Sequence, residues 1–530
     1  MQITLYILSL IGSGAGFMTQ MLVSGFWTTA FSQDVFYYSI NLATYLLALG
    51  LGSLLSNYFK KTTLKHLGIL ILSLLWVSGL AIPFLKMGIK GFGNNILFPL
   101  AVVSLAGVLN GMVIPLTLKI GSDFQSISLA LLFFVDYSAA TVFTFIFTFV
   151  LLIPLGYSKT ALILSLGSTV LVALTLFLQK QLSIRTGICT GVLSVLSLVL
   201  YFTSGSHIAP KMDKTGTANI IYSEQSHYQK IILTEEPPSK ESQNRTSQHV
   251  LFLDGFVQFS SVDEANYHLC LADVPMGAAG YQKKAVKEVL ILGGGDGLAA
   301  RNFLKTRGIE KVTLVELDPA MIRLAKEHPI FRKYNLDSLN NPKVEVIVAD
   351  AFRWVQENRI RLKSRYDLII IDFPAPKNLT LARLFSAEFY QAAFELLAPK
   401  GFVSIQSGPS YSYEDPSRIT LSKVTASILE TIESIGYRVF PYVTPLDSEA
   451  FVLVTSDPEF KMDVFSRKMG IYTGGAMSFF CRYDTAWVRP KVEINTLNTL
   501  KLSQYMIQWF NNASDIFFYY RGNHAVFLPE

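Results

Sequence analysis

The first 205 residues contain very few acidic side chains. They hold no glutamate and three aspartates (Asp34, Asp123 and Asp136), together with nine of the chain's 45 Lys and Arg residues. The rest of the chain has 36 basic and 36 acidic residues, so the net charge of +6 belongs entirely to the first part. This imbalance is typical of basic loops beside a membrane and gives no indication of nucleic-acid binding.

Cysteine is also scarce, with three in 530 residues. Cys189, Cys270 and Cys481 lie far apart in the chain and are odd in number. Disulfide frameworks and zinc sites use even sets or closely spaced pairs of cysteines. The sequence therefore predicts neither a disulfide framework nor a metal site.

Long apolar segments dominate the first part of the chain. A bilayer crossing takes about 20 apolar residues, and seven such segments lie near 3–24, 35–58, 66–85, 95–118, 126–153, 160–179 and 186–203. The first lacks a basic stretch before its apolar run, and more spans follow it, so a span is favoured over a cleaved signal peptide. Residues 1–205 are predicted to form an all-α polytopic membrane bundle of about seven spans.

Asp136, in the segment LLFFVDYSAATVF, is the only acid well inside one of these spans. A charge at that depth is costly and usually faces a bundle interior or a polar partner. A structural hydrogen bond is favoured over a role in transport. An Asp136→Asn variant would distinguish the two.

After Ser204 the sequence pattern changes to short, alternating segments. ANIIYSEQSHYQKIILTEE and QHVLFLDGFVQFSS predict hairpin strands, and VDEANYHLCLADVPM predicts a helix. From residue 286, continuous apolar strands alternate with helices, which is typical of a doubly wound, mainly parallel sheet. The predicted order is a small β-domain with its helix (206–285), a Rossmann-like α/β domain (286–460) and a C-terminal tail (461–530).

The predicted parallel strands end in side chains of chemical interest. In sheets of this kind, ligands bind beyond the carboxyl ends of the strands. Successive strands end in the loop Gly293-Gly294-Gly295-Asp296-Gly297, in Glu316, in Asp350-Ala351, in Asp372 and in Gln406-Ser407-Gly408. We expect the first four groups to bind a ligand together.

Four carboxylates at these strand ends predict a cationic ligand. Glu316 follows the glycine loop by about 20 residues, where an acid can bind both ribose hydroxyls of a nucleoside. Asp350, followed by the small Ala351, suits the edge of an adenine ring. A phosphate would be repelled by Asp296 inside the loop, so a phosphate-bearing dinucleotide is disfavoured.

These motifs resemble those of the spermidine synthases, or polyamine aminopropyltransferases. The resemblance covers roughly residues 220–457 and rests on GGGDG, VELDP, ADAF, YDLIIIDFPAP and LFSAEFY, preceded by YQKIIL, LFLDGFVQ and DEANYH. DYSAATVFTFIFTFVLLIPLGY and VEINTLNT are similar to a span and to the C-terminal tail of the family's membrane-bound branch.

The resemblance implies transfer of an aminopropyl group from decarboxylated S-adenosylmethionine to putrescine or a related amine, giving spermidine and methylthioadenosine. By their match to the family motifs, Asp372 is the catalytic base, and Gln229, Gly293, Gly295, Asp296, Glu316, Asp350 and Ala351 bind the donor. Tyr267, His268 and Asp296 surround the aminopropyl arm and the amine. The donor is a co-substrate, and no prosthetic group is implied.

Asp296 gains a role from this implied donor. The donor has a free amine and no carboxylate, so an acid in the glycine loop can hold the amine. The same acid would repel the carboxylate of ordinary S-adenosylmethionine. Asp296 is therefore predicted to select between the two.

The chain departs from the family pattern mainly where the amine acceptor would bind. The usual second Asp of the catalytic motif is Ala375, and the usual Glu of Tyr-His-Glu is Leu269. A His a few positions further on is Asp273, the Tyr-Pro-Ser-Gly loop is VTPLDSEAFV, and the membrane branch's Glu-Ile-Pro-Leu begins with Val113. The donor is therefore better supported than putrescine as the acceptor.

Simpler interpretations remain for four of these residues. Asp372 could cap a helix, and Glu316 could be a surface acid. His268 could be an interface histidine with satisfied hydrogen bonds, and Gln229 could be an ordinary strand residue. For the whole chain, the alternatives are a methyltransferase, which Asp296 disfavours, and a non-catalytic nucleoside- or polyamine-binding sensor or transporter.

The predicted location follows from the donor rather than from charge. Six Lys and Arg residues in loops on one side of the spans against five on the other do not decide orientation. Because the implied donor is cytosolic, we expect an integral protein of the bacterial plasma membrane with its catalytic domain in the cytoplasm. The lipid bilayer and a small amine are the expected partners, and a homo-oligomer is an open alternative because the family's members are commonly oligomers.

Overall fold

The computed structural model divides into two compact units, with the boundary between Ile220 and Ile221. It describes residues 2–31, 34–60, 62–92, 96–122, 128–178, 180, 219–236, 247–254, 256–376, 378–409, 419–444, 449–469, 481 and 489–512, with scattered residues from 185 to 199. The two units are considered separately below.

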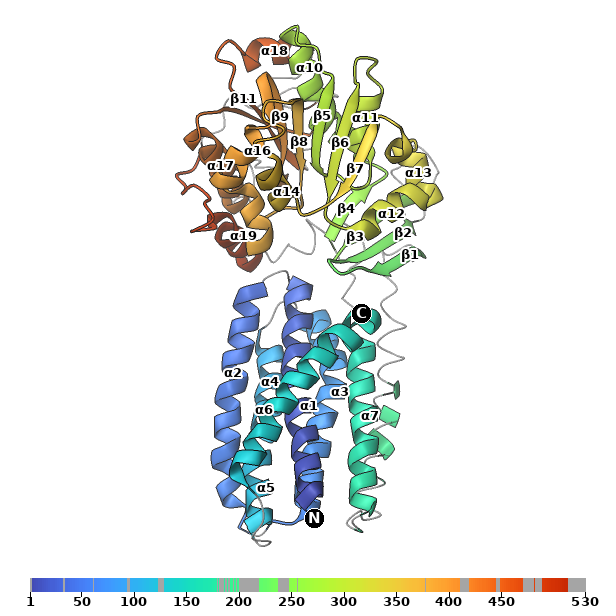
Figure 1. The fold of residues 1–530 in the computed structure, drawn as a ribbon, viewed down its shortest axis with the longest axis vertical. Helices are drawn as coiled ribbons and strands as arrows, with labels where there is room; N and C mark the ends of the chain where they lie inside the picture. Colours follow the sequence, from blue (N-terminus) through green and yellow to red (C-terminus); the bar gives the residue numbers. More distant parts are fainter. Residues whose placement is uncertain are drawn as a thin grey trace. The chain divides into compact units, whose positions relative to one another are not determined.

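The first unit is a bundle of long apolar helices (Figure 1). Its elements are α1 (Gln2–Phe31), α2 (Asp34–Leu55), α3 (Leu64–Phe92), α4 (Leu97–Gly111) with α5 (Val113–Ser122), α6 (Leu129–Phe145) with the π-helix η2 (Ile146–Leu152), and α7 (Ile153–Leu178). By length and composition, six helices in the described part of the chain could cross a membrane. The seventh predicted segment, 186–203, lies largely outside the described residues.

Helix α1 lies at the centre of this bundle. Its most apolar window is 78% buried, against 11% for the span that contains α6. Asp136 of α6 accepts a hydrogen bond from the Ser13 hydroxyl of α1. The structural hydrogen bond expected for Asp136 is thus present, and it ties a peripheral helix to the central one.

The second unit begins with a small antiparallel sheet. Strands β1 (Asn219–Gln225), β2 (Lys230–Glu236), β3 (Gln248–Leu253) and β4 (Phe256–Ser260) pair in sequence order. One face of alternating apolar residues, including Leu233 and Leu251, packs in a cluster with Met321 and Phe331 from the α/β part. This packing attaches the small sheet to the rest of the unit.

A seven-stranded mixed sheet forms the main part of the second unit, in the order β10-β11-β9-β8-β5-β6-β7 (Figure 1). The neighbours β9-β8-β5-β6-β7 are parallel, whereas β10 and β11 are antiparallel. The strands span β5 (Glu288–Gly293), β6 (Lys311–Glu316), β7 (Val344–Val348), β8 (Tyr366–Asp372), β9 (Leu397–Pro409), β10 (Arg438–Val443) and β11 (Glu449–Thr455).

Helices cover both faces of this sheet, as expected for apolar parallel strands. One apolar cluster joins the sheet to α14 (Ala351–Asn358), α16 (Ala387–Phe394), α17 (Ile419–Ser434) and α19 (Lys501–Asn512). A second cluster joins the other face to α10 (Val274–Tyr281), α11 (Leu298–Leu304) and α18 (Met462–Met469). Further helices include α9 (Glu264–His268), α12 (Pro319–Glu327), α13 (Pro329–Asn335) and α15 (Leu379–Ala382), and the fold class agrees with the prediction.

The helix predicted from residue 262 is interrupted. After α9, the π-helix η3 (Leu269–Asp273) leads into α10. Single π turns inside helices are frequent at functional sites. Here η3 directly follows Tyr267 and His268, which both line the cavity described below.

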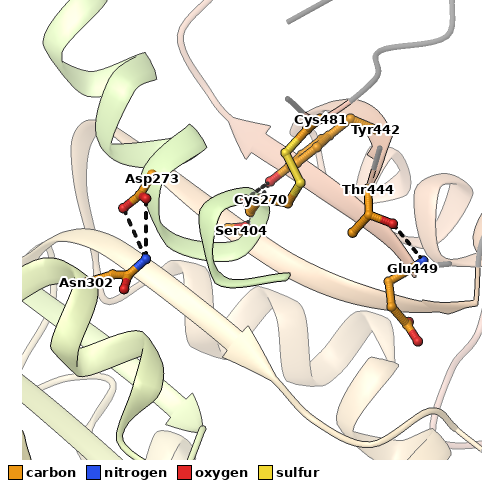
Figure 2. The surroundings of a disulfide bond; sticks show 8 residues. All are labelled: Cys270, Asp273, Asn302, Ser404, Tyr442, Thr444, Glu449 and Cys481. Carbon is orange, nitrogen blue, oxygen red and sulfur yellow. Dashed lines mark hydrogen bonds between the residues drawn. A yellow bond between two sulfur atoms is a disulfide. The ribbon is translucent and has the colours of Figure 1, made fainter. Parts of the chain in front are cut away.

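The sequence predicts no disulfide framework, and the structure contains one disulfide that the cysteine count does not indicate. Cys270 of η3 and Cys481 are joined by a disulfide across a sequence separation of 211 residues, and both side chains are fully buried (Figure 2). Counting cysteines failed because the bond joins two residues with no local spacing pattern. Among the described residues, no His, Cys, Asp and Glu cluster could hold a metal ion.

Candidate functional site

All ten residues predicted for the site line one cavity of about 370 Å³ at the carboxyl edge of the parallel strands. They are Gln229, Tyr267, His268, Gly293, Gly295, Asp296, Glu316, Asp350, Ala351 and Asp372. They meet because the parallel strands β5, β6, β7 and β8 all end at the same edge, where the small sheet and α9 also contribute. The volume suits a small organic ligand.

The glycine loop after β5 allows close approach of its neighbours. A Cβ on Gly293, whose φ is +87°, would lie 2.2 Å from the carbonyl oxygen of Asp372. A Cβ on Gly295 would lie 2.7 Å from Cγ of Glu316. A side chain at Gly293 would therefore clash with the backbone at the end of β8, and one at Gly295 would displace the Glu316 side chain.

The side chain of Asp296 both bonds the start of α11 and lines the cavity. Its Oδ1 accepts a hydrogen bond of 2.9 Å from the backbone N–H of Leu298, at the start of α11. Its side chain is partly exposed and lines the cavity. The hydrogen bond to the first residue of α11 fixes the carboxylate of Asp296 at the cavity wall, where its charge would attract a cation.

Glu316, at the end of β6, is not the surface acid that was considered as an alternative. Burial raises its pKa to about 7, and the charges of Asp318 and Asp296 add to this shift. Its Oε1 accepts the backbone N–H of Asp318 at 3.0 Å. A pair of hydroxyl donors would stabilise this carboxylate in its charged form.

Gln229 lies just before β2, so it is not an ordinary strand residue. Its Nε2 donates to Oδ2 of Asp318 at 3.0 Å, and the hydroxyl of Ser226 donates to the same oxygen at 2.6 Å. Oδ1 of Asp318 accepts the backbone N–H of Ala320 and caps α12. Asp318 thus fixes Gln229 of the small-sheet region against the α/β fold.

Asp350 begins α14 and has two partners. Its Oδ1 accepts the backbone N–H of Arg353 at 3.1 Å, and its Oδ2 is paired with the guanidinium of Arg383. Arg383 also lies over the ring of Phe352, 5.4 Å from its centroid. Ala351 follows on the helix and is buried at 8% exposure, leaving space at the cavity wall.

Asp372, at the end of β8, does not cap the helix that follows it. That cap is Asn378, whose Oδ1 accepts the backbone N–H of Leu381 at 2.8 Å. Asp372 instead accepts a 2.6 Å hydrogen bond from the Tyr267 hydroxyl. The pKa of Asp372 is raised to about 6: burial is the largest cause and the charge of Asp296 adds to it, whereas His268 and the Tyr267 hydroxyl act in the opposite direction.

His268 has one ring nitrogen bonded and one without a partner in the described structure. Nδ1 donates to the backbone carbonyl of Glu264 at 2.8 Å, and Nε2 is buried and unpaired. An interface histidine with both ring nitrogens hydrogen-bonded is therefore not what the described structure shows, because only Nδ1 has a partner. Burial lowers the pKa of His268, but Glu264, Asp296 and Asp372 outweigh this, so its pKa lies above the usual value.

An ion pair anchors the helix that carries Tyr267 and His268. The guanidinium of Arg301 on α11 contacts both carboxylate oxygens of Glu264 on α9, at 2.9 and 3.1 Å. Burial alone would raise the pKa of Glu264, but hydrogen bonds from His268 and Arg301 reverse this and lower its pKa to about 2. The pair holds α9 against the helix that starts at the glycine loop.

Comparison with known proteins gives the family. Residues 264–445 match the model of the spermine/spermidine synthase domain. The chain is 32% identical to a polyamine aminopropyltransferase of Leptospira interrogans over 97% of its own length and 100% of that protein. The chain belongs to the polyamine aminopropyltransferase family. It is also 33% identical to polyamine aminopropyltransferase 1 of Streptomyces coelicolor, over 80% of this chain and 78% of that one.

Among solved structures, spermidine synthase from Thermotoga maritima is 26% identical, covers 50% of this chain and 81% of its own length, and gives a TM-score of 0.38. The long N-terminal apolar region lies within the extent of the Leptospira match. The chain is a polyamine aminopropyltransferase family enzyme, and its similarity to the Leptospira protein extends beyond the matched domain.

The cavity is strongly acidic. Within the described residues, its wall carries seven carboxyl groups and, as basic side chains, His268 and Arg383: the acids are Asp254, Asp296, Glu316, Asp318, Asp350, Asp372 and Glu449. Such a wall favours cationic ligands and disfavours phosphates. This agrees with the cationic ligand predicted from the strand ends.

The sequence does not indicate a role for several residues that line the cavity. Arg383 pairs with Asp350, and Asp318 accepts a hydrogen bond from Gln229. The segments LARLF and VELDP, which contain Arg383 and Asp318, do not indicate these contacts. The sequence indicates Gln406 only as a strand end, and it gives no role to Glu449, whose segment stands where the family pattern has a loop. The apolar run EAFVLVT was the available signal for a strand there.

Proposed function

We propose that this enzyme transfers an aminopropyl group from decarboxylated S-adenosylmethionine to putrescine or a related amine, giving spermidine and methylthioadenosine. The observation that carries this proposal is the position of Asp372: half-buried, hydrogen-bonded to Tyr267 and facing an acidic cavity that also contains Asp296. A base next to a cation-binding wall is what amine alkylation by a sulfonium donor requires.

On this proposal, the donor occupies the side of the cavity formed by β5, β6 and β7. Glu316 accepts both ribose hydroxyls, and Asp350 with Ala351 contacts the adenine edge. Gln229 contacts the nucleoside, and the bare backbone of Gly293 and Gly295 permits close approach. The charge of Asp296 holds the donor's amine and disfavours the carboxylate of intact S-adenosylmethionine, which argues against a methyltransferase.

The chemical step needs only one deprotonation. The acceptor's ammonium group, with a pKa near about 10 in water, must lose a proton before its nitrogen can attack. Asp372 accepts that proton, the nitrogen bonds to the propyl carbon next to sulfur, and the carbon–sulfur bond breaks as methylthioadenosine leaves. Tyr267 and His268 orient the carboxylate and the reacting arm.

The helical unit is proposed to hold the enzyme in a membrane. We assign 1–205 to a bundle in the bacterial plasma membrane, 206–285 to the β-domain and its helix, 286–460 to the catalytic domain and 461–530 to a tail. The cytoplasm is the proposed location of the catalytic domain, since the donor is cytosolic. A homo-oligomer is compatible with this arrangement.

Full-length protein in detergent, with decarboxylated S-adenosylmethionine and a panel of amines, tests the function. We expect amine-dependent methylthioadenosine release, measured by mass spectrometry, to fall by roughly 10²- to 10⁴-fold in Asp372→Asn, the usual effect of losing a general base. Asp367→Asn is the matched control, because Asp367 lies near the start of the same strand, outside the cavity lining, and accepts the backbone N–H of Lys287.

Tight donor binding without release from any amine would contradict catalysis and favour a sensor or transporter. Methyl transfer from intact S-adenosylmethionine would favour a methyltransferase. Release with an amine other than putrescine would keep the mechanism and change the acceptor.

A further inference from the structure

The order of the strands divides the cavity into two sides around Asp372. β8 carries Asp372, and β5, β6 and β7 follow on one side with Asp296, Glu316 and Asp350 at or just beyond their ends. On the other side lie β9 and β11. The proposed donor residues from the sheet occupy the first side, which leaves the β9–β11 side for the acceptor.

The family pattern has a second acid three residues after the catalytic one, and this chain lacks it. Ala375 stands there, with 8% of its surface exposed, and its methyl group packs in the apolar cluster beside Phe373. Ala375 lines the cavity but offers no charge. An acceptor with a second ammonium group needs an anion from elsewhere.

Glu449 supplies a carboxyl group on that side. It begins β11, which runs antiparallel to β9, so the start of β11 lies at the carboxyl edge of the sheet. Its backbone N–H donates to the Thr444 hydroxyl at 3.2 Å, a contact drawn in Figure 2. The side chain extends from this fixed backbone and lines the same cavity as Asp372.

Gln406 of β9 supports Glu449 and has an unused acceptor. Its Nε2 donates to Oε2 of Glu449 at 3.1 Å. Its Oε1 has no partner in the described structure, although the residue is only 8% exposed and lines the cavity. A buried acceptor without a donor is costly, and an ammonium group has three donors to offer.

The charges connect Glu449 to the reaction centre. Tyr267, which donates to Asp372, feels the charges of Asp372, Glu449 and Asp296. The pKa of Glu449 is raised to about 8. Burial is the largest cause, the Gln406 hydrogen bond acts against it, and the charges of Asp263 and Asp372 add to it. A bound cation would favour the charged carboxylate, so Glu449 is suited to a positive ligand.

We propose that Glu449, held by Gln406, binds the second ammonium group of a diamine acceptor and makes the enzyme select diamines over monoamines. This inference rests on the proposed aminopropyl transfer. Asp372 deprotonates one end of the acceptor, and the pair Glu449–Gln406 binds the other end. The acid missing at Ala375 is thereby replaced from a different strand.

The test compares two acceptors of equal carbon length, putrescine and n-butylamine, on full-length protein in detergent. In Glu449→Gln, we expect KM for putrescine to rise roughly 10- to 100-fold, as for the loss of a hydrogen bond to a charged group. KM for n-butylamine should change less than about twofold, because it has no second ammonium group. Glu449→Asp should recover part of the putrescine affinity.

Glu388→Gln serves as the matched control. Glu388 lies on α16 outside the cavity lining and accepts the backbone N–H of Leu497, so neither acceptor should be affected. Equal changes for both acceptors in Glu449→Gln, or no change for either, would overturn the role of Glu449.

Failure of the proposed function is recognised separately. If wild-type protein releases no methylthioadenosine with any amine, aminopropyl transfer is wrong. Calorimetric titration of putrescine and n-butylamine then tests Glu449 alone: weaker putrescine binding only in Glu449→Gln supports the site, and unchanged binding refutes it.

Discussion

At the scale of single residues, the environment of Asp372 determines when it can act as a base. Burial is the main cause that raises its pKa to about 6, and the Tyr267 hydroxyl opposes the rise by hydrogen bonding to the charged form. The base works only when deprotonated. Activity should therefore increase as pH rises through the pKa of Asp372 and should be lost below it.

Tyr267→Phe removes a hydrogen bond that stabilises the charged carboxylate. The acidic limb of kcat/KM against pH should have an apparent pKa near 6 in the wild type. In the variant this limb should move to higher pH, because the remaining burial and the charge of Asp296 then act with less opposition. Steady-state rates from pH 5 to 9 check this shift, and an unmoved limb would show that Tyr267 does not act through Asp372.

The sequence predicts those site residues that follow apolar strands, because the carboxyl ends of parallel strands lie at the same edge of the sheet. Glu316 and Asp372 follow apolar strands, so their meeting in one cavity follows from a parallel sheet. The partners that fix them could not be foreseen. Whether Asp350 pairs with Arg383, or Gln229 with Asp318, depends on the packing of segments that are distant in sequence.

At the scale of elements, alternating strands and helices were predictable and the last hairpin was not. The strands β5 to β9 are apolar runs separated by helices, a pattern that specifies a buried parallel sheet. The segment VTPLDSEAFV stands where the family pattern has a loop, whereas its second part begins β11. The apolar run EAFVLVT indicates a strand, but it does not indicate that this strand pairs antiparallel with β9 and brings Glu449 to the cavity.

The disulfide is an element-scale constraint with a measurable effect. Removing a native disulfide typically costs about 2–5 kcal/mol, and the bond between Cys270 and Cys481 spans 211 residues. We expect the double variant Cys270→Ala/Cys481→Ala to unfold at lower temperature than the wild type. Reductant should lower the wild-type melting temperature and leave that of the double variant unchanged.

Cys189→Ala is the control for this comparison, since Cys189 is the cysteine outside the pair. Thiol titration of denatured, unreduced protein should find one free thiol per chain. Three free thiols would contradict the disulfide.

At the scale of the whole molecule, the N-terminal region and the rest of the chain differ in their content of charged residues. The region before residue 206 carries no glutamate, and the remainder has equal numbers of basic and acidic residues. The number of spans was largely predictable from apolar length, but their orientation was not, because the loop charges are nearly balanced. The disulfide adds an opposing indication, since such bonds are rare in reducing compartments.

A reporter protein fused after residue 530 tests the proposed orientation. We expect a fluorescent reporter that folds in the cytoplasm to be active, and a phosphatase that needs an oxidising compartment to be inactive. Complete burial of both cysteine side chains slows the attack of a reductant on the folded protein, so the bond can persist there, whereas unfolding on heating exposes it to reductant. The opposite reporter pattern would place the catalytic domain outside the cytoplasm and make the disulfide unexceptional.

The same bond changes the connectivity of the polypeptide. Residues 270 to 481 form a closed covalent ring, and every strand of the large sheet, from β5 to β11, lies within it. A single protease nick inside the ring opens it without producing two separable fragments. The nicked catalytic unit would keep its intact mass on a non-reducing gel, and a loop cut in the cell would leave the halves of the sheet joined beside His268.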